Sequence, residues 1–349
     1  MVEWLKNAVF YEIYPQSFAD TNADGIGDMQ GIIDHLDYIA ELGCNAIWLN
    51  PCFESPFLDA GYDVSDYMKV APRYGTNADL KRLFDEAHKR DMHVLLDLVP
   101  GHTSWDHEWF KESLKPEKNP YSGRYVWTDD AWTEFEGDEN IRGFLRGMSQ
   151  RNGCVAVNFY AHQPCLNYGC YKVENPSWQQ PMDSEDALST REAIKDVMRF
   201  WLKMGCDGFR VDMAGSLVKN DPDQEGTIAL WRDFRDFLDK EFQAFRPDVV
   251  YTDSVCFWGK LNAWKHHVPM VLYPQTGEQH AAARRVTEIG AGIMLKDDSS
   301  EGIRASVREI LKHKAYGNAA AKCSKDFRDC SGAAGAAKFI ENAPHSPVK

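Results

Sequence analysis

The sequence lacks the features that mark several common classes of protein. No run approaches the ~18 consecutive apolar residues that a membrane helix needs. The N-terminal segment, MVEWLKNAVFYEIYP, has no apolar stretch long enough for a secretory signal. The nine cysteines include no CxxC pair, and closely spaced zinc ligands are missing. We therefore expect a cytoplasmic protein with reduced thiols and no membrane partner.

Positive charge is also scarce. The 349 residues carry 39 Lys and Arg against 53 Asp and Glu, a formal net charge of −14. An acidic surface repels phosphate backbones, so we expect no nucleic-acid partner. Hydrophobic residues make up 44% of the chain, which is enough for a sizeable core.

The charge is unevenly distributed, which predicts a boundary near residue 245. Residues 246–349 carry 15 Lys and Arg against 11 Asp and Glu, whereas residues 1–245 carry 24 against 42. Nine of the eleven tryptophans also precede residue 246. We therefore expect one domain over 1–245 and a second over 246–349.

Strands and helices alternate before this boundary. The hydrophobic pattern predicts strands at 8–14, 45–50, 93–99 and 208–212, and helices at 29–42, 78–90, 188–204 and 227–242. This order favours parallel βαβ units. A long irregular stretch interrupts it over 100–184, and a stretch of that length is either functional or a small subdomain.

Arg210 and Asp212 are the first candidates for chemistry. Side chains alternate along the strand GFRVD, so these two share one face, at the strand's C-terminal end. In a parallel βα barrel that end carries the active site. A carboxylate beside a guanidinium stays ionised, as a nucleophile requires. A structural ion pair explains the same spacing.

Four further residues are candidates for binding a sugar. Asp97 ends a predicted strand and His102 follows it in DLVPGH, so the two are able to bind hydroxyl groups. A capping Asp with a loop His explains that pattern equally well. In GYDVSDY, Tyr62 offers a stacking surface and Asp63 a second hydroxyl clamp.

The segment from Asp20 to Asp28 suggests a calcium loop. Its oxygen ligands stand at every second position, with glycines for the turn. The candidate ligands are Asp20, Asn22, Asp24, the Ile26 carbonyl and Asp28. The loop is shorter than an EF-hand loop and lacks the closing Glu, so an Asx-rich turn without metal remains the alternative.

Together these segments resemble the α-amylase family of glycoside hydrolases. The resemblance rests on AVFYEIYPQSFADTNADGIGDMQGI, AIWLNP, GYDVSDY, DLVPGH, QPCLNYG and GFRVDMA, in the family's order over about 240 residues. It implies a partial TIM-type (β/α) barrel, with an inserted subdomain at about 103–184 after the third strand. It also implies a structural calcium ion, Asp212 as nucleophile, Arg210 beside it, and Asp97 and His102 in the sugar subsite.

The family's second carboxylate is not where the resemblance places it. A Glu ends the fifth strand in the family, whereas the corresponding strand here is VVYTD, which ends in Asp253. Asp253 is therefore the candidate acid. The family's later His-Asp signature is absent, and no later segment resembles barrel strands six to eight.

The remainder of the chain resembles a macrolide-type, nucleotide-sugar-dependent glycosyltransferase. Residues 246–271 resemble part of its N-terminal domain, and residues 269–341 resemble the end of its Rossmann-like α/β donor domain. Pro274, Glu278 and Gln279 match its PxxxEQ signature, which implies that Glu278 and Gln279 hold the donor sugar. The preceding histidine-glycine stretch that binds the diphosphate is missing.

Three functions follow from these resemblances. The first is a retaining hydrolase that acts on an oligosaccharide or another α-glucoside and is impaired by the missing acid Glu. The second is a nucleotide-sugar-dependent glycosyltransferase. The third is a non-catalytic chimeric product, because an open half-barrel leaves strand edges unpaired.

Overall fold

The computed structural model describes residues 4–133, 141–242, 250–253, 269–272, 283–284, 286–296 and 299–329. The chain forms two compact units, Met1–Asp253 and Ser254–Lys349. The strand at 250–253 therefore belongs to the first unit, although its sequence resembles the second.

Five parallel strands form the sheet of the first unit. They are β1 (Phe10–Ile13), β2 (Ala46–Leu49), β5 (His93–Leu98), β8 (Gly208–Val211) and β9 (Val250–Asp253), in that spatial order. Each consecutive pair is parallel. β8 is buried throughout and β5 from its second residue, as expected for a parallel sheet covered on both faces. The predicted partial barrel is confirmed.

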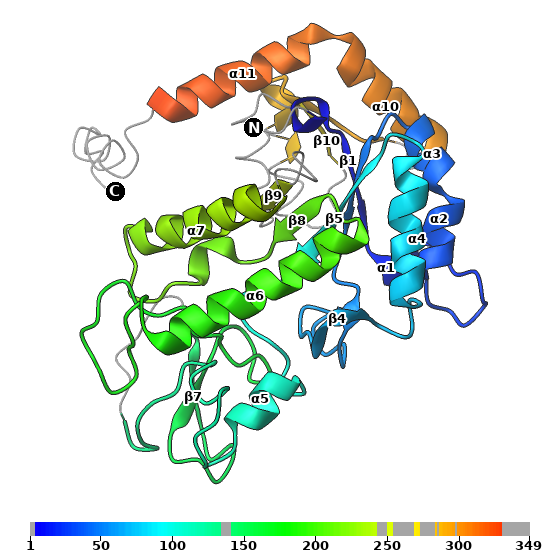
Figure 1. The fold of residues 1–349 in the computed structure, drawn as a ribbon. Coiled ribbons are helices and arrows are strands. Elements are labelled where there is room, and N and C mark those ends of the chain that lie inside the picture. The colour runs from blue at the N-terminus through cyan, green and yellow to red at the C-terminus, as the bar shows by residue number, and fades with distance from the viewer. Residues whose placement is uncertain are drawn as a thin grey trace, which may run out of the picture. The chain divides into compact units, whose positions relative to one another are not determined.

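Helices between the strands lie around this sheet (Figure 1). They are α1 (Pro15–Phe18), α2 (Met29–Asp34), α3 (Leu36–Glu41), α4 (Asn77–His88), α6 (Glu185–Met204) and α7 (Glu225–Phe242), and short 3-10 turns cover Trp4–Asn7 and Ala214–Ser216. A capping box of Thr76 and Asp79 begins α4. Ser184 caps α6, which ends at Gly205 with a φ of 120°.

The single helix predicted over 29–42 is two helices in the structure. His35 ends α2 and precedes α3, with a φ of −107° and a ψ of 7°. Its ring nitrogen Nδ1 lies 2.7 Å from the Gly31 carbonyl oxygen and donates to it, which replaces part of the helical ladder. The hydrophobic period carries no signal for this break.

The irregular segment after β5 is a subdomain with its own core, as predicted. It contains α5 (Glu108–Ser113) and an antiparallel pair, β6 (Gly143–Arg146) and β7 (Cys154–Val157). A second antiparallel pair, β3 (Phe53–Glu54) and β4 (Asp66–Val70), precedes α4. The subdomain core consists of Val126, Ile141, Ala156, Cys165, Cys170 and Trp178.

The second unit is a small α/β arrangement. Strands β10 (Met270–Leu272) and β11 (Gly292–Met294) pair in parallel, and helices α10 (Ser300–Lys312) and α11 (Lys314–Asp329) follow. Val286, Ala291 and Ala320 form its core with Met270 and Leu272.

Candidate active site

Asp97, Arg210 and Asp212 meet at the C-terminal end of the sheet. Asp97 and Arg210 are partners in the register of β5 and β8, and Asp212 directly follows β8. Arg210 Nη1 donates to Asp97 Oδ1 at 2.9 Å, to Asp97 Oδ2 at 3.0 Å and to Asp212 Oδ1 at 2.9 Å. One guanidinium therefore joins both predicted carboxylates.

The two carboxylates differ in accessibility. The side chain of Asp97 is fully buried and that of Arg210 is 6% exposed, whereas that of Asp212 is 16% exposed. Asp97 also accepts a hydrogen bond of 3.1 Å from Trp48 Nε1. Asp97 thus binds Arg210 on its buried side. Asp212 is the more accessible of the two carboxylates.

Burial and the Arg210 guanidinium shift the pKa values of Asp97 and Asp212 in opposite directions. Burial raises the pKa of Asp97 to about 7, and Arg210 opposes the shift. Burial also raises the pKa of Asp212, again against Arg210, and the charge of Asp59 adds to the increase. Burial lowers the pKa of Arg210, but both carboxylates outweigh it and the net pKa is raised.

Tyr62 belongs to this cluster. Its hydroxyl oxygen lies 3.1 Å from Asn50 Oδ1 and 3.3 Å from Asp97 Oδ2. The Arg210 guanidinium carbon lies 4.9 Å from the centre of the Trp48 ring and 5.9 Å from that of Tyr62. Trp48 and Tyr62 therefore enclose the cation, which strengthens its interactions by excluding water.

Asp63, the predicted second hydroxyl clamp, lies in the loop after β3. It is 0% exposed, and its carboxylate accepts hydrogen bonds from the Ser55 hydroxyl and from the Leu58 and Asp59 backbone N–H groups. These bonds organise the loop after β3. Its contact with a sugar hydroxyl stays a prediction.

Asp59, from the same loop, was missed by the sequence reasoning. It is half-buried and accepts a hydrogen bond of 2.7 Å from Gln163 Nε2. Its negative charge raises the pKa of Asp212. The signal was an acidic residue in the loop before Tyr62, but nothing in the pattern distinguished it from Asp63.

His102 is 3% exposed and both its ring nitrogens have protein partners. Nε2 lies 3.1 Å from the Tyr62 carbonyl oxygen, and Nδ1 lies 3.0 Å from Asn158 Nδ2. The geometry assigns the proton to Nε2, because a carbonyl only accepts. Burial lowers the pKa of His102 to about 4, so the ring is neutral near pH 7. In this structure His102 connects the Tyr62 loop to the subdomain, and its contact with a sugar stays a prediction.

Asp253 is the last residue of β9, in register with Val211. Its backbone is described and its side chain lies outside the described residues. Glu278 and Gln279 also lie outside them, as does Pro274.

The five predicted calcium ligands lie in one loop before α2. Asp20 accepts hydrogen bonds from the backbone N–H groups of Asn22, Ala23 and Gly25, and Asp24 accepts one from Ile26. The N–H of Gly25 contributes most to lowering the pKa of Asp20. Asp28 caps α2 through Gly31. Within the described residues, no three His, Cys, Asp or Glu side chains are grouped to hold a metal. The calcium prediction therefore rests on mixed carboxylate, amide and carbonyl oxygens.

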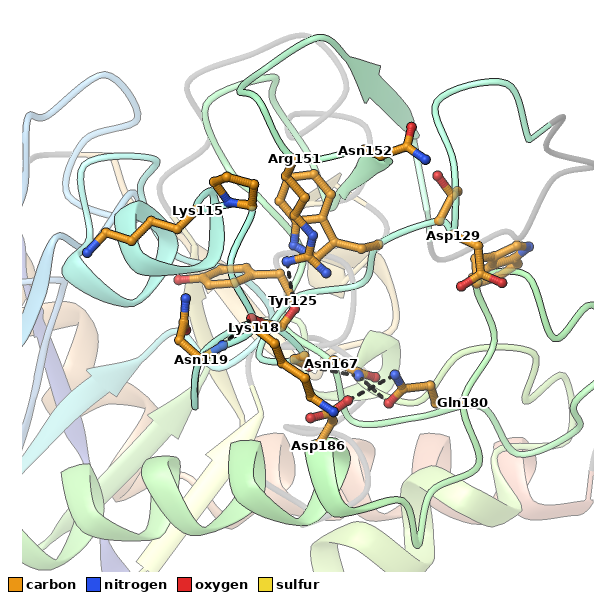
Figure 2. A pocket seen from close by; sticks show the side chains of 16 residues that line it. Lys115, Lys118, Asn119, Tyr125, Asp129, Arg151, Asn152, Asn167, Gln180 and Asp186 are labelled. Carbon is orange, nitrogen blue, oxygen red and sulfur yellow. Dashed lines mark hydrogen bonds between the residues drawn. The ribbon is translucent and has the colours of Figure 1, made fainter.

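A separate cavity of about 300 Å³ lies inside the subdomain (Figure 2). Figure 2 shows the side-chain amide of Gln180 directed at Asn167 and Asp186. Its hydrogen bonds to these two residues are both 3.0 Å long. Arg151 donates to the carbonyl oxygens of Ser113 and Ser122. None of the predicted catalytic residues lines this cavity, so it is distinct from the site at Asp212.

The fold and these contacts define a partial (β/α)-barrel unit with two carboxyl groups joined by one guanidinium at its C-terminal end. Residues 12–247 match the family of the alpha amylase catalytic domain. The chain therefore belongs to the α-amylase family. Residues 257–331 match the UDP-glucoronosyl and UDP-glucosyl transferase family, which supports the transferase-like second segment.

Curated relatives agree with this assignment. The chain is 39% identical to an oligo-1,6-glucosidase of Bacillus sp. strain F5 over 251 residues, which cover 72% of this chain and 44% of the relative. It is 41% identical to a trehalose synthase/amylase of Mycolicibacterium smegmatis, over 64% of this chain and 35% of the relative. The chain thus spans less than half the length of these relatives.

Solved structures show the same fold. A trehalulose synthase of Pseudomonas mesoacidophila MX-45 is 33% identical, with a TM-score of 0.57 over 73% of this chain and 45% of that one. An isomaltulose synthase of Klebsiella sp. LX3 is 33% identical, with a TM-score of 0.58 over 72% of this chain and 45% of that one. Among the described residues, no helix is long and apolar enough to cross a membrane.

Proposed function

We propose that the barrel unit cleaves α-glucosidic bonds of an oligosaccharide or a simple α-glucoside by a retaining mechanism. One observation carries this proposal: Arg210 joins buried Asp97 to the more accessible Asp212 at the C-terminal end of the sheet. The family membership of residues 12–247 and the names of the relatives, glucosidases among them, support the substrate class.

In this mechanism Asp212 attacks the anomeric carbon. Arg210 donates to Asp212 Oδ1, so we assign the attack to Oδ2. The glycosidic C–O bond breaks as the ester with Asp212 forms, and the leaving oxygen keeps the electron pair and takes a proton. Water then hydrolyses the ester and restores the carboxylate.

We assign the proton donor to Asp253. It ends the strand next to β8, and the resemblance places the acid of the family at the end of its fifth strand. In retaining enzymes the two carboxyl groups lie ~5–5.5 Å apart. The side chain of Asp253 is one methylene shorter than that of Glu, and an error of ~1 Å costs about 100-fold. The proposal therefore implies slow turnover of substrates with poor leaving groups.

Asp212→Asn tests the proposal. We expect the variant to lose at least about 1,000-fold in kcat/KM on p-nitrophenyl α-glucoside, because an amide is not a nucleophile. The change is nearly isosteric, and an unchanged melting temperature rules out misfolding. Wild-type turnover that survives this substitution contradicts the proposal.

The match of residues 257–331 favours a second candidate, transfer from a nucleotide sugar. Consumption of UDP-glucose in the presence of a sugar acceptor tests it. Glu278→Ala and Gln279→Ala are expected to abolish that consumption and to leave the α-glucosidase rate unchanged. UDP-glucose that is stable with the wild-type chain excludes this function.

A further inference from the structure

The cavity inside the subdomain contains an arginine that the protein anchors along one edge. Arg151 Nη1 donates to the carbonyl oxygens of Ser113 at 2.8 Å and of Ser122 at 2.7 Å. The guanidinium carbon of Arg151 lies 4.2 Å from the centre of the Trp127 ring, so a face of the cation is covered as well. The position of this guanidinium is therefore fixed before any ligand binds.

The other edge of the same guanidinium, formed by Nε and Nη2, is open. In the part of the chain that the structure describes, these two nitrogens of Arg151 have no hydrogen-bond acceptor. Neither nitrogen is completely buried. Because Arg151 lines the cavity, a ligand there reaches both of these donors. Such an edge matches two oxygens of a carboxylate or a phosphate.

The charges around the cavity leave this cation without a carboxylate partner. Within the described ranges, Arg151 and Lys118 form no ion pair, whereas Lys115 is paired with Glu112. Burial lowers the pKa of Arg151 to about 10, and the charge of Asp186 only opposes that shift. Removing a cation from water without a counter-ion is unfavourable, and a bound anion offsets that cost.

A second buried arginine increases the positive potential. Arg124 is 8% exposed and stands in sequence between Gly123 and Tyr125, which both line the cavity. Its Nη2 donates to Ser189 Oγ at 3.0 Å, and its Nε is buried without a partner. Within the described ranges, Arg124 also forms no ion pair. The positive charge at this cavity contrasts with the acidic composition of residues 1–245.

Positive and negative charges are separated within the lining. Figure 2 shows Lys118 and Arg151 towards one side of the pocket and Asp129 towards the other. Asn119, which also lines the pocket, lies on the side of the two cations (Figure 2). The volume of about 300 Å³ is that of a small-molecule site.

We propose that this cavity binds a small oxyanion, a phosphate or a carboxylate group, which the open edge of Arg151 holds and Lys118 helps to neutralise. The proposal does not depend on the hydrolase function, because the cavity is separate from the site at Asp212. It assigns no chemical step to the cavity.

Titration of the full chain tests the site. Inorganic phosphate and acetate are the probes, at pH 7, with sodium chloride keeping the ionic strength constant. We expect saturable binding by calorimetry and a melting temperature that rises with the concentration of the bound probe. The probe that binds more tightly identifies the group. Absence of saturable binding for both probes overturns the proposal.

Charge-neutralising variants locate the anion. Arg151→Gln should abolish binding, and the exposed Lys118→Gln should weaken it about threefold without affecting the fold. Arg146→Gln is the matched control, because Arg146 is exposed on β6 of the same subdomain and does not line the cavity. It should bind as the wild type does. If Lys118→Gln and Arg146→Gln both bind as the wild type does, the site is overturned, whether or not Arg151→Gln folds.

Asp186→Asn should have the opposite effect. The change is nearly isosteric and removes a negative charge from the lining, so we expect the anion to bind about threefold more tightly. A neutral ligand would not respond in this direction. Weaker or unchanged binding of the anion by Asp186→Asn overturns the electrostatic basis of the site.

The guanidinium of Arg210 is the alternative place for an anion. Asp212→Asn removes a carboxylate that is bonded to Arg210, so an anion at Arg210 would bind more tightly to this variant. An anion in the subdomain cavity should bind to Asp212→Asn and to the wild type with equal affinity. Tighter binding by Asp212→Asn therefore overturns the assignment to the cavity.

Discussion

Burial and Arg210 act in opposite directions on the charge state of the nucleophile. Burial raises the pKa of Asp212, Arg210 lowers it and Asp59 raises it further. The attacking form is the carboxylate, so the acid limb of the pH–rate profile reports this pKa. Because the net pKa is raised, we expect the wild-type limb above the ordinary Asp value of ~3.9.

Arg210→Met should move this limb to higher pH. Removing the cation removes the influence that lowers the pKa, so Asp212 stays protonated to higher pH and kcat/KM at pH 5 falls. The measurement is a pH profile with p-nitrophenyl α-glucoside. Arg210→Lys keeps the charge and should keep the limb closer to the wild-type position. A limb that does not move in Arg210→Met contradicts the electrostatic role.

At this scale the sequence predicted what periodicity controls. Arg210 and Asp212 share a face because a strand alternates, and Asp97 joins them because neighbouring parallel strands end at one edge. Asp59 and Asp63 lie in one loop without a period. Which of them is buried depends on the hydrogen bonds of Ser55 and Leu58, and the sequence carries no spacing rule for that choice.

Among the elements, the loop before α2 is packed closely against the first helix. A Cβ added to Gly27 would lie 2.1 Å from the Pro15 carbonyl oxygen, so only glycine allows this approach. Tertiary contact therefore fixes the path of the loop. We propose that this loop binds Ca²⁺ through Asp20, Asn22, Asp24, the Ile26 carbonyl and Asp28.

Calcium should therefore raise the melting temperature. A ligand that binds only the native state stabilises it by RT ln(1 + [L]/Kd), about 2.7 kcal/mol at a concentration of 100 Kd. Differential scanning calorimetry in EDTA and in millimolar Ca²⁺ measures the shift, and Asp24→Ala should abolish it. Identical melting temperatures with and without Ca²⁺ mean that the segment is an Asx-rich turn.

Strand β9 carries the candidate acid, Asp253, and the effect of its side-chain length on the rate can be tested. Asp253→Glu adds one methylene at the end of β9, where the family has Glu. We expect kcat/KM on maltotriose to rise about tenfold or more, because the proton donor then reaches closer to the leaving oxygen. The rate on p-nitrophenyl α-maltoside should change little, since that leaving group needs no proton.

Comparison of these two substrates also checks the wild-type chain. Asp253→Asn serves as the control and should lower the maltotriose rate further. Comparable wild-type rates on maltotriose and p-nitrophenyl α-maltoside would mean that another carboxyl group is the acid.

The short antiparallel pairs escaped sequence-based prediction for a related reason. β3 has two residues, too short for a hydrophobic period, and β6 lies in the irregular segment, where no regular alternation of strand and helix marks it. Long buried strands and amphipathic helices, by contrast, were predicted near their observed bounds, as with β5 and α6. Local pattern determines these longer elements, whereas pairing with a neighbouring strand determines β3 and β6.

Over the whole molecule, the order of strands follows from alternation, but the place of β9 does not. Its sequence resembles a transferase, yet it pairs in register with β8. Strand pairing satisfies backbone N–H and C=O groups whatever the side chains are, so the open edge of a sheet accepts a strand of almost any sequence. Composition and resemblance therefore both placed the boundary before the strand.

Asp207 connects distant parts of the barrel unit. Its side chain is 1% exposed; Oδ2 lies 2.8 Å from His88 Nε2 at the end of α4 and accepts a 2.8 Å hydrogen bond from the Val94 N–H of β5. Oδ1 lies 3.4 Å from His93 Nδ1. Burial raises the pKa of Asp207, but these partners outweigh it and lower the pKa to about 2.

The lowered pKa predicts a loss of stability in acid. The folded state favours the ionised form of Asp207 more than the unfolded state does. In the unfolded state the pKa of an Asp is ~3.9, so the stabilisation is complete above that pH. It amounts to roughly 2 kcal/mol and is lost as the pH falls from about 4 towards 2.

In urea titrations, Asp207→Asn should be less stable than wild type by about that amount at pH 7, and the difference should shrink at pH 3. Asp37→Asn, at a carboxylate that is 76% exposed and paired with Arg90, is the matched control and should show a much smaller difference. A difference for Asp207→Asn that stays constant between pH 7 and pH 3 would mean that hydrogen-bond geometry, and not the charge of Asp207, holds α4, β5 and β8 together.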